Sequence, residues 1–189
     1  TTQEHNAWIN YAGVQALWDK LYAQFGLKSF MAGNSGTQMG GWFLKEIKSV
    51  EDFKGLKMRI PGLAAEVLNR MGGTAVALPG GEIMPSLQSG AIDATEWIGP
   101  WNDLAFGFYK ITKFYYGPGF HEPSSVLECG INLEAYNQLE NDLKKIVEIA
   151  CEAENSRMLS EFTAANIDAQ QKLVNQHGVK INNFPKDVF

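Results

Sequence analysis

The stretch Leu56-Lys57-Met58-Arg59-Ile60-Pro61-Gly62 contains a short apolar strand that ends at a Pro-Gly turn. A helix is predicted over residues 64–71, ending before a Gly-Gly pair, and a second short strand over residues 75–78. A strand, a helix and a strand in this order are typical of a βαβ unit, in which the two strands are parallel. The stretch therefore predicts an α/β fold.

Further helices and strands are predicted on both sides of this unit. Helices are expected over residues 14–22, 82–89 and 100–109, and strands over residues 27–30, 92–97, 113–116 and 126–132. After Leu133, apolar residues recur every three or four positions, and no Pro or Gly occurs until Gly178. An unbroken helix of about 43 residues would be roughly 65 Å long. Because this exceeds the diameter of a small lobe, the helix must kink, break or span two lobes, and we expect it to span them.

Composition describes an ordinary globular protein and argues against several functions. The chain has 189 residues, of which 45% are hydrophobic and 20% charged, and a net charge of −5. This acidic balance, without a Lys/Arg cluster, argues against nucleic-acid binding. No apolar run approaches the roughly 20 residues that span a bilayer, and no N-terminal signal peptide is recognisable in this chain. The GxSxG, GxGxxG, P-loop and HExxH motifs are absent, so we do not expect an enzyme.

The two cysteines, Cys129 and Cys151, could pair, but one bridge in a domain of this size is no disulfide framework. Free cysteine packs as a small hydrophobic residue. We therefore expect two buried free thiols.

Candidate binding residues lie where two predicted strands end. Arg59 precedes the Pro-Gly turn, and the carboxyl edge of an open α/β sheet is where ligands bind. A guanidinium there could grip a carboxylate through two hydrogen bonds, or it could be a solvated side chain. Glu96 sits where the next strand leaves the sheet, and a buried carboxylate needs a partner or a metal. The partner of the Glu96 carboxylate could be a bound ligand or metal, or it could be a basic residue in a structural salt bridge. Trp97 could form an aromatic wall beside it.

Two further residues extend this set. Gln38 lies in a glycine-rich stretch that could admit a ligand or ion but could also be a simple turn. Glu122 is a weaker acidic candidate. Amide, carboxylate and backbone oxygens together suit a hard cation such as Ca²⁺ or Na⁺. Zinc is disfavoured, because the three histidines are scattered along the sequence and the cysteines form no CxxC pair.

Three motifs resemble those of a known family. They cover residues 33–43 (Gly-Asn-Ser-Gly-Thr-Gln-Met-Gly-Gly-Trp-Phe), 55–62 (Gly-Leu-Lys-Met-Arg-Ile-Pro-Gly) and 90–100 (Gly-Ala-Ile-Asp-Ala-Thr-Glu-Trp-Ile-Gly-Pro). Together they resemble the DctP-type solute-binding proteins of TRAP transporters. The first and third motifs resemble the subgroup that binds 2-oxo acids or lactate together with a cation.

This resemblance implies a two-lobed α/β fold like that of periplasmic binding proteins, with crossover strands and a long connecting helix. It implies that the N-terminal part of the first lobe is missing here, since such receptors usually carry about another hundred residues before the matching region. Residues 1–29 and 93–123 would then belong to a partial first lobe, and residues 30–92 and 124–189 to the second.

The resemblance also assigns roles. It implies that Arg59 holds the substrate carboxylate, and that Gln38, Glu96 and the backbone carbonyl of Trp97 bind a bridging cation, with Glu122 as a further ligand. The implied protein is a periplasmic receptor that binds a small organic monocarboxylate, such as pyruvate or lactate, in an interlobe cleft. It would deliver this ligand to the membrane subunits of a TRAP transporter, and the full-length protein could form a homodimer.

Two other functions are compatible with the same residues. The fold could serve as a ligand-sensing input for a membrane signalling protein, or Glu96 could act as the general base of a hydrolase or lyase. The sequence does not distinguish pyruvate from longer 2-oxo acids or 2-hydroxy acids, because all offer the same carboxylate and neighbouring oxygen.

Overall fold

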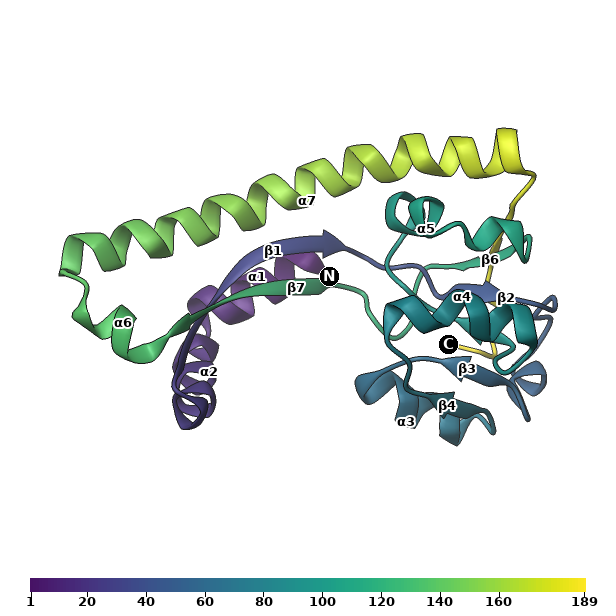
Figure 1. The fold of residues 1–189 in the computed structure, drawn as a ribbon, viewed down its shortest axis with the longest axis horizontal. Coiled ribbons are helices and arrows are strands. Elements are labelled where there is room, and N and C mark those ends of the chain that lie inside the picture. The colour runs from purple at the N-terminus through teal and green to yellow at the C-terminus, as the bar shows by residue number, and fades with distance from the viewer. The chain divides into compact units, whose positions relative to one another are not determined.

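The computed structural model describes residues 1–189, and its contacts divide the chain into two compact units (Figure 1). Unit 1 comprises Thr1–Thr37 and Ser124–Ala164, and unit 2 comprises Gln38–Pro123 and Ala165–Phe189. The chain therefore passes between the units three times. No helix is at once long enough and apolar enough to cross a membrane.

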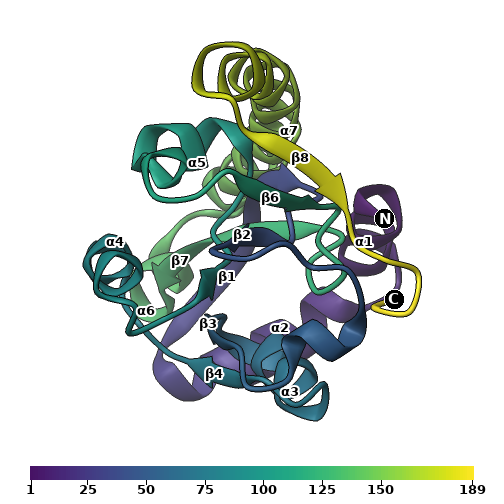
Figure 2. The same ribbon diagram turned by 90° about the vertical axis from the view of Figure 1, so that its right-hand side faces the viewer.

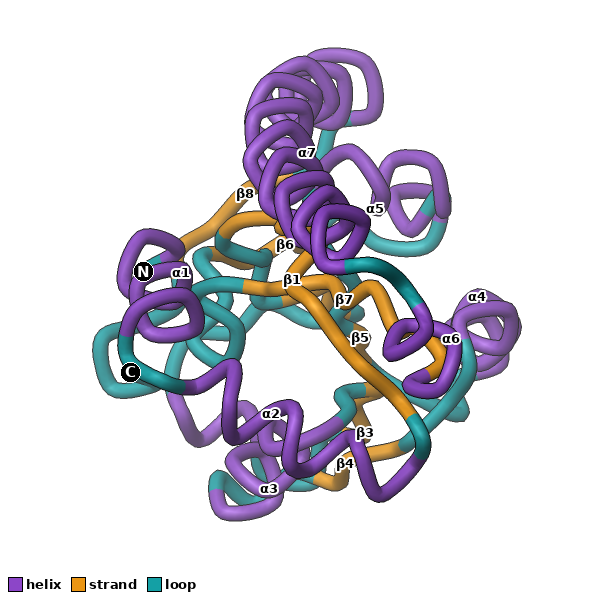
Figure 3. The backbone as a smooth tube through the Cα atoms, turned by 90° about the vertical axis from the view of Figure 1, so that its left-hand side faces the viewer, coloured by secondary structure: helices purple, strands orange, loops and turns teal.

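Unit 1 is built on a long antiparallel pair of strands, β1 (Leu27–Gly36) and β7 (Ser125–Asn132) (Figure 3). The pair places Phe30 opposite Cys129. Its helical elements are α1 (Thr2–Tyr11), α2 (Val14–Tyr22), the 3₁₀ turn η1 (Ala23–Phe25), α6 (Leu133–Gln138) and the first part of α7 (Asn141–His177). A small core forms where the strands meet α6 and α7, around Phe30, Tyr136 and Cys151.

The predicted long helix is broken once. It begins as α6, stops where Leu139 adopts an extended conformation, and resumes as α7, which has 37 residues. Leu139 packs against the core of unit 1, which explains a break without Pro or Gly. At 1.5 Å per residue α7 is about 55 Å long. Its first part belongs to unit 1 and its last part to unit 2. The helix therefore spans both units, as expected for a helix longer than a small lobe.

Unit 2 contains a six-stranded mixed sheet in the order β4-β3-β5-β2-β6-β8. Its strands are β2 (Gly41–Phe43), β3 (Lys57–Arg59), β4 (Thr74–Val76), β5 (Ala94–Thr95), β6 (Phe114–Gly117) and β8 (Lys180–Asn183). Its helical elements are η2 (Val50–Phe53), α3 (Gly62–Arg70), α4 (Gly80–Ser89), α5 (Pro100–Phe106), η3 (Phe108–Lys110) and the last part of α7. The predicted βαβ unit is confirmed, because β3 and β4 flank α3 and pair in parallel.

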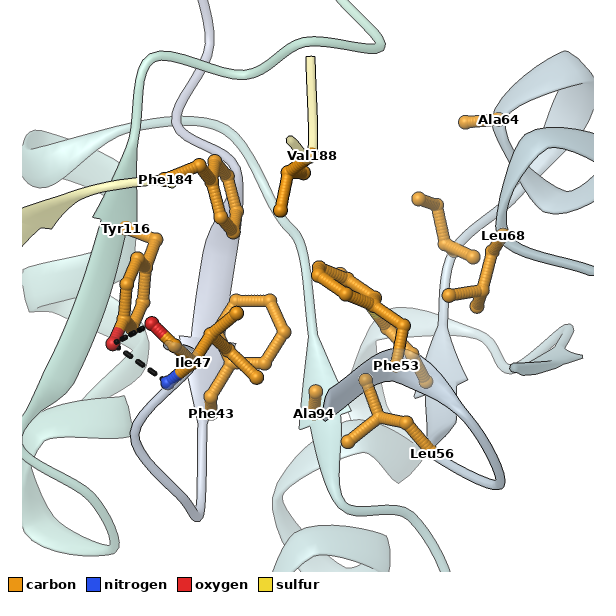
Figure 4. Packing of buried hydrophobic residues seen from close by; sticks show 12 residues of the cluster. Phe43, Ile47, Phe53, Leu56, Ala64, Leu68, Ala94, Tyr116, Phe184 and Val188 are labelled. Atoms are coloured by element: carbon orange, nitrogen blue, oxygen red, sulfur yellow. Dashed lines mark hydrogen bonds between the residues drawn. The ribbon is translucent and has the colours of Figure 1, made fainter. Parts of the chain in front are cut away.

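Apolar side chains cover both faces of this sheet. Neighbouring strand residues point to opposite faces, so Trp42 and Tyr115 pack with α4, whereas Phe43 and Tyr116 join the core that α3 covers. Figure 2 shows α4 and α5 on one side of the sheet and α3 on the other. Figure 4 shows the core that α3 covers. In this core the Tyr116 hydroxyl donates to the carbonyl of Ile47 and accepts from the N–H of Ile47. The layered α/β arrangement holds the strand ends that carry the site.

The two units divide the chain differently from the expected lobes. We expected residues 1–29 to group with 93–123, and residues 30–92 with 124–189. Instead, the pairing of β1 with β7 keeps both strands in unit 1, and the pairing of β2 with β5 and β6 keeps residues 93–123 with 38–92 in unit 2. The boundaries therefore follow strand pairing, which periodicity does not reveal.

Candidate functional site

The parallel pairing of β3 and β5 brings Arg59 and Glu96 together. Arg59 stands opposite Thr95 in the register, so the next residue of the chain, Glu96, lies at the same edge. Arg59 Nη1 forms an ion pair with the Glu96 carboxylate, and Arg59 Nε donates to the carbonyl of Leu78 at 3.2 Å. Both side chains are largely withdrawn from solvent, at 13% and 3% exposure. The salt bridge that sequence analysis left open is thus present.

Trp97 lies against this pair. The Arg59 guanidinium carbon is 5.3 Å from the centre of the Trp97 ring, which is within the range of a cation–π interaction. The indole also contacts Phe106, at 4.8 Å between ring centres, and lies close to Gly80, where an added Cβ would come 3.0 Å from the ring. Trp97 therefore limits the orientations open to the guanidinium.

Gln38 and Glu122 are held side by side by their backbones. The N–H of Gln38 donates to the carbonyl of Glu122 at 3.1 Å, and the N–H of Gly119 donates to the carbonyl of Gln38 at 2.7 Å. The Gln38 side chain is buried, and its Oε1 has no hydrogen-bond partner. A buried carbonyl oxygen without a partner is costly, so this atom is suited to an ion or ligand.

A histidine completes a cluster with the two carboxylates. One ligand atom each of Glu96, His121 and Glu122 lies within 4.8 Å of the others, and His121 Nε2 is 3.8 Å from Glu96 Oε2. The His121 side chain is 2% exposed, yet neither ring nitrogen has a hydrogen-bond partner. His121 was not predicted as a site residue, because the three histidines are scattered along the sequence. Its position beside Glu122 was the available signal.

The charges in this cluster are unbalanced. Burial and the nearby Glu96 carboxylate raise the pKa of Glu122, while His121 and Arg59 act in the opposite direction. Two carboxylates thus share one nearby guanidinium. A bound cation would relieve their repulsion, and the carboxylate and amide oxygens of Glu96, Glu122 and Gln38 are the donor types that Ca²⁺ and Na⁺ prefer. The residues present therefore fit such an ion, and the His121 ring lies beside them.

The segment that carries Glu96 and Trp97 is fixed by Asp103, which sequence analysis also missed. Asp103 Oδ1 accepts from the N–H groups of Ile98 and Gly99 at 3.2 and 3.1 Å. Its Oδ2 accepts from Trp42 Nε1 at 2.9 Å and from the Tyr115 hydroxyl at 2.7 Å. Burial raises the pKa of Asp103 to about 6 against these hydrogen bonds. A single buried carboxyl thus ties the strand end to the sheet.

Replacing Gly119 by alanine is expected to destabilise the protein by about 1–3 kcal/mol, the usual cost of overpacking. The new Cβ would lie 2.9 Å from the carbonyl oxygen of Gln38 and 3.1 Å from that of Met39, and backbone atoms cannot rotate away. Gly81 is the matched control, because a Cβ there meets nothing within 4 Å. Urea unfolding would compare the two variants. Equal stability of Gly119→Ala and Gly81→Ala would contradict the proposed tight contact.

Comparison with known proteins supplies context for this geometry. The family described as "DctP: Bacterial extracellular solute-binding protein, family 7" matches residues 1–188. A monocarboxylate 2-oxoacid-binding periplasmic protein of Nostoc sp. is 44% identical over 186 residues. A TRAP periplasmic solute-binding protein of Colwellia psychrerythraea, solved with bound calcium and pyruvate, is 45% identical with a TM-score of 0.92. One of Pseudoalteromonas atlantica, solved with bound sodium and pyruvate, is 43% identical with a TM-score of 0.92.

The chain matches only part of each of these proteins. The matches cover 98% of this chain for the Nostoc and Colwellia proteins and 100% for the Pseudoalteromonas protein. They cover 51% of the Nostoc protein and 57% of each of the two solved chains. The chain therefore spans about half the length of the relatives it matches.

Proposed function

Because the chain belongs to the DctP family of bacterial extracellular solute-binding proteins, we propose that it binds a small 2-oxo monocarboxylate together with Ca²⁺ or Na⁺ on unit 2. The periplasmic-binding-protein fold of its relatives, with TM-scores of 0.92, supports this proposal. The family is one of solute receptors, so binding is the activity and no chemical step is involved.

One observation carries the proposal: a guanidinium, two carboxylates and a histidine without a hydrogen-bond partner converge within unit 2. Gln38, whose buried Oε1 has no partner, is joined to Glu122 by a backbone hydrogen bond. Arg59 uses Nη1 for Glu96 and Nε for Leu78, and a guanidinium has five N–H donors. The remaining donors would bind the carboxylate of the ligand. The Trp97 ring beneath the guanidinium would hold it in place for this contact.

We propose Gln38, Glu96, the backbone carbonyl of Trp97 and Glu122 as the cation ligands. A cation held there would also meet the ligand carboxylate, and a 2-oxo or 2-hydroxy oxygen beside that carboxylate could complete a chelate. The relatives from Colwellia and Pseudoalteromonas were solved with pyruvate and, respectively, calcium and sodium. This supports an oxygen-rich site that tolerates either ion. We propose that His121 lies beside the ion and donates a hydrogen bond to an oxygen of the bound organic acid.

We further propose that the protein acts outside the cytoplasm and passes its ligand to the membrane subunits of a TRAP transporter. The support is the family description and the periplasmic location stated for the Nostoc protein. Binding in a cleft between two closing lobes, and a homodimer of the full-length protein, stay predictions.

Calorimetric titration tests the ligand class. Pyruvate, longer 2-oxo acids and lactate would each be titrated with Ca²⁺, with Na⁺ and with a chelator in sodium-free buffer. We expect the tightest binding for a 2-oxo acid in the presence of a cation. A protein that binds sugars or amines but none of these acids would contradict the proposal.

Replacing Glu96 by glutamine is expected to weaken cation-dependent binding of the acid by roughly 10- to 100-fold. The amide oxygen can still accept from Arg59, but the negative charge that attracts the cation is lost. Titration of the variant with and without Ca²⁺ measures the change, and Glu66→Gln, on the exposed side of α3, is the matched control. Acid binding that is indifferent both to chelation and to sodium removal would exclude the bridging ion.

A further inference from the structure

The chain has only two cysteines, and the structure places them next to each other in unit 1. Cys129 is on β7, opposite Phe30 of β1, and Cys151 is on α7. Both pack in the small core around Phe30 and Tyr136, and both are free thiols. Burial, followed by the charge and hydrogen bonding of the neighbouring Cys129 thiol, raises the pKa of Cys151 to about 11. Because both pack in this one small core, the two side chains are neighbours at the interface between β7 and α7.

Such a contact between the only two cysteines is unusual by chance. A buried residue touches about 6–12 others, so a second cysteine placed at random in a chain of this length would touch the first in roughly one case in twenty. Two isolated thiols that serve only as small hydrophobic residues have no reason to be neighbours. Two cysteines that form a disulfide bond, in contrast, must be neighbours.

We propose that Cys129 and Cys151 form a disulfide bond that links β7 to α7 in the mature protein. Family membership places the protein outside the cytoplasm, where thiols are oxidised and disulfides persist. We expected free thiols, because one bridge in a domain of this size is no disulfide framework and free cysteine packs as a small hydrophobic residue. The inference concerns unit 1 alone and does not depend on which ligand unit 2 binds.

The oxidant is a disulfide, either that of a thiol oxidase or oxidised glutathione. The Cys129 thiolate attacks one sulfur of this disulfide, which forms a mixed disulfide and releases the first thiol. The Cys151 thiolate then attacks the Cys129 sulfur, which forms the protein bond and releases the second thiol. The two cysteines lose two electrons and two protons, and the oxidant gains both. Cys129 attacks first because it is only half-buried, whereas Cys151 is buried.

Thiol labelling tests the bond directly. The protein isolated from an oxidising compartment would be denatured and alkylated with and without prior reduction, and its mass measured. We expect no alkylated cysteine without reductant and two after reduction. Two alkylated cysteines without reductant, both in the isolated protein and after incubation with oxidised glutathione, would overturn the proposal. A reducible dimer would overturn it as well, because the bond would then join two chains.

Single variants test the order of attack. Under native conditions with oxidised glutathione, Cys151→Ser is expected to carry glutathione on Cys129, and Cys129→Ser is expected to react much more slowly. Equal rates of modification would contradict the assignment of Cys129 as the attacking thiol.

The bond closes a loop of about 20 residues, so reduction is expected to lower the melting temperature of the wild type by about 5–10 °C. The variant Cys129→Ala/Cys151→Ala is the matched control, and its melting temperature should not respond to reductant. An equal response of the wild type and this variant would overturn the proposed cross-link. Acid binding, measured in the same samples, would report on unit 2 independently.

Discussion

Replacing Arg59 by methionine is expected to weaken binding of the organic acid at least about 100-fold, because truncating one partner of a buried, hydrogen-bonded charge pair costs roughly 2–5 kcal/mol. Methionine keeps much of the side-chain volume and can still lie on Trp97, but it offers no donor to a carboxylate. Arg59→Lys keeps the charge without the two-pronged geometry and is expected to restore only part of the affinity. Calorimetric titration with pyruvate and Ca²⁺ measures all three proteins.

The single variant Arg59→Met is also expected to lose stability, and this loss has to be distinguished from a loss of affinity. Removing Arg59 leaves the Glu96 carboxylate buried without its partner, which typically destabilises a protein by about 3–5 kcal/mol. The double variant Arg59→Met/Glu96→Gln removes both charges and should fold while failing to bind the acid. Arg70→Met, on the exposed side of α3, is the matched control and should bind normally. Unchanged affinity of a folded double variant would remove both residues from the binding site.

The second large effect is expected at Asp103. Replacing it by alanine leaves the Trp42 indole N–H, the Tyr115 hydroxyl and two backbone N–H groups without their acceptor in the interior. Each unsatisfied buried group costs about 1–3 kcal/mol, so we expect a total loss of roughly 3–5 kcal/mol after some rearrangement. Urea unfolding measures it, with Asp168→Ala on the exposed side of α7 as the control. A loss below about 1 kcal/mol would show that the network does not hold the strand end.

The raised pKa of Asp103 gives this residue a pH dependence of definite sign. Its pKa rises from 3.8 to about 6 on folding, so the folded protein binds this proton more tightly than the unfolded chain. The resulting stabilisation is complete below the unfolded value and is lost as pH rises through the folded one, a change of about 3 kcal/mol. The wild type should therefore lose stability relative to Asp103→Asn between about pH 4 and 6. A constant difference over this range would contradict the shift.

The fold could be predicted where the apolar pattern and the positions of Gly and Pro indicate the same secondary structure. Residues 56–78 alternate between apolar strands and a helix that ends at glycine, and the structure contains the expected parallel unit there. Helix α1 was not predicted, because only Ile9 of this helix is buried and no periodic apolar stripe exists. Its one signal was the capping box formed by Thr1 and Glu4. The break at Leu139 could not be predicted either, since it arises from packing against distant residues.

The candidate site was predictable only in part, because some of its contacts join residues that are far apart in the sequence. Arg59 ends β3 and Glu96 directly follows β5, and the carboxyl ends of a parallel pair of strands share one edge of the sheet. Their meeting thus follows from local pattern and topology. The approach of His121 to Glu96 and the contact of Asp103 with Trp42 join residues far apart in the sequence, and local pattern does not reveal such contacts. Periodicity finds elements, whereas such contacts depend on how the elements pack.

The threefold passage of the chain between the units has a consequence for protein synthesis. Unit 2 contains Gln38–Pro123, yet its edge strand β8 pairs with β6 and is translated only after the whole of α7. At about 5–20 residues per second, the ribosome needs several seconds to make the intervening segment. During this time the edge of β6 has no neighbour, and exposed strand edges attract other chains. We therefore expect this edge of nascent chains to stay open to other chains until Lys180–Asn183 emerge from the ribosome.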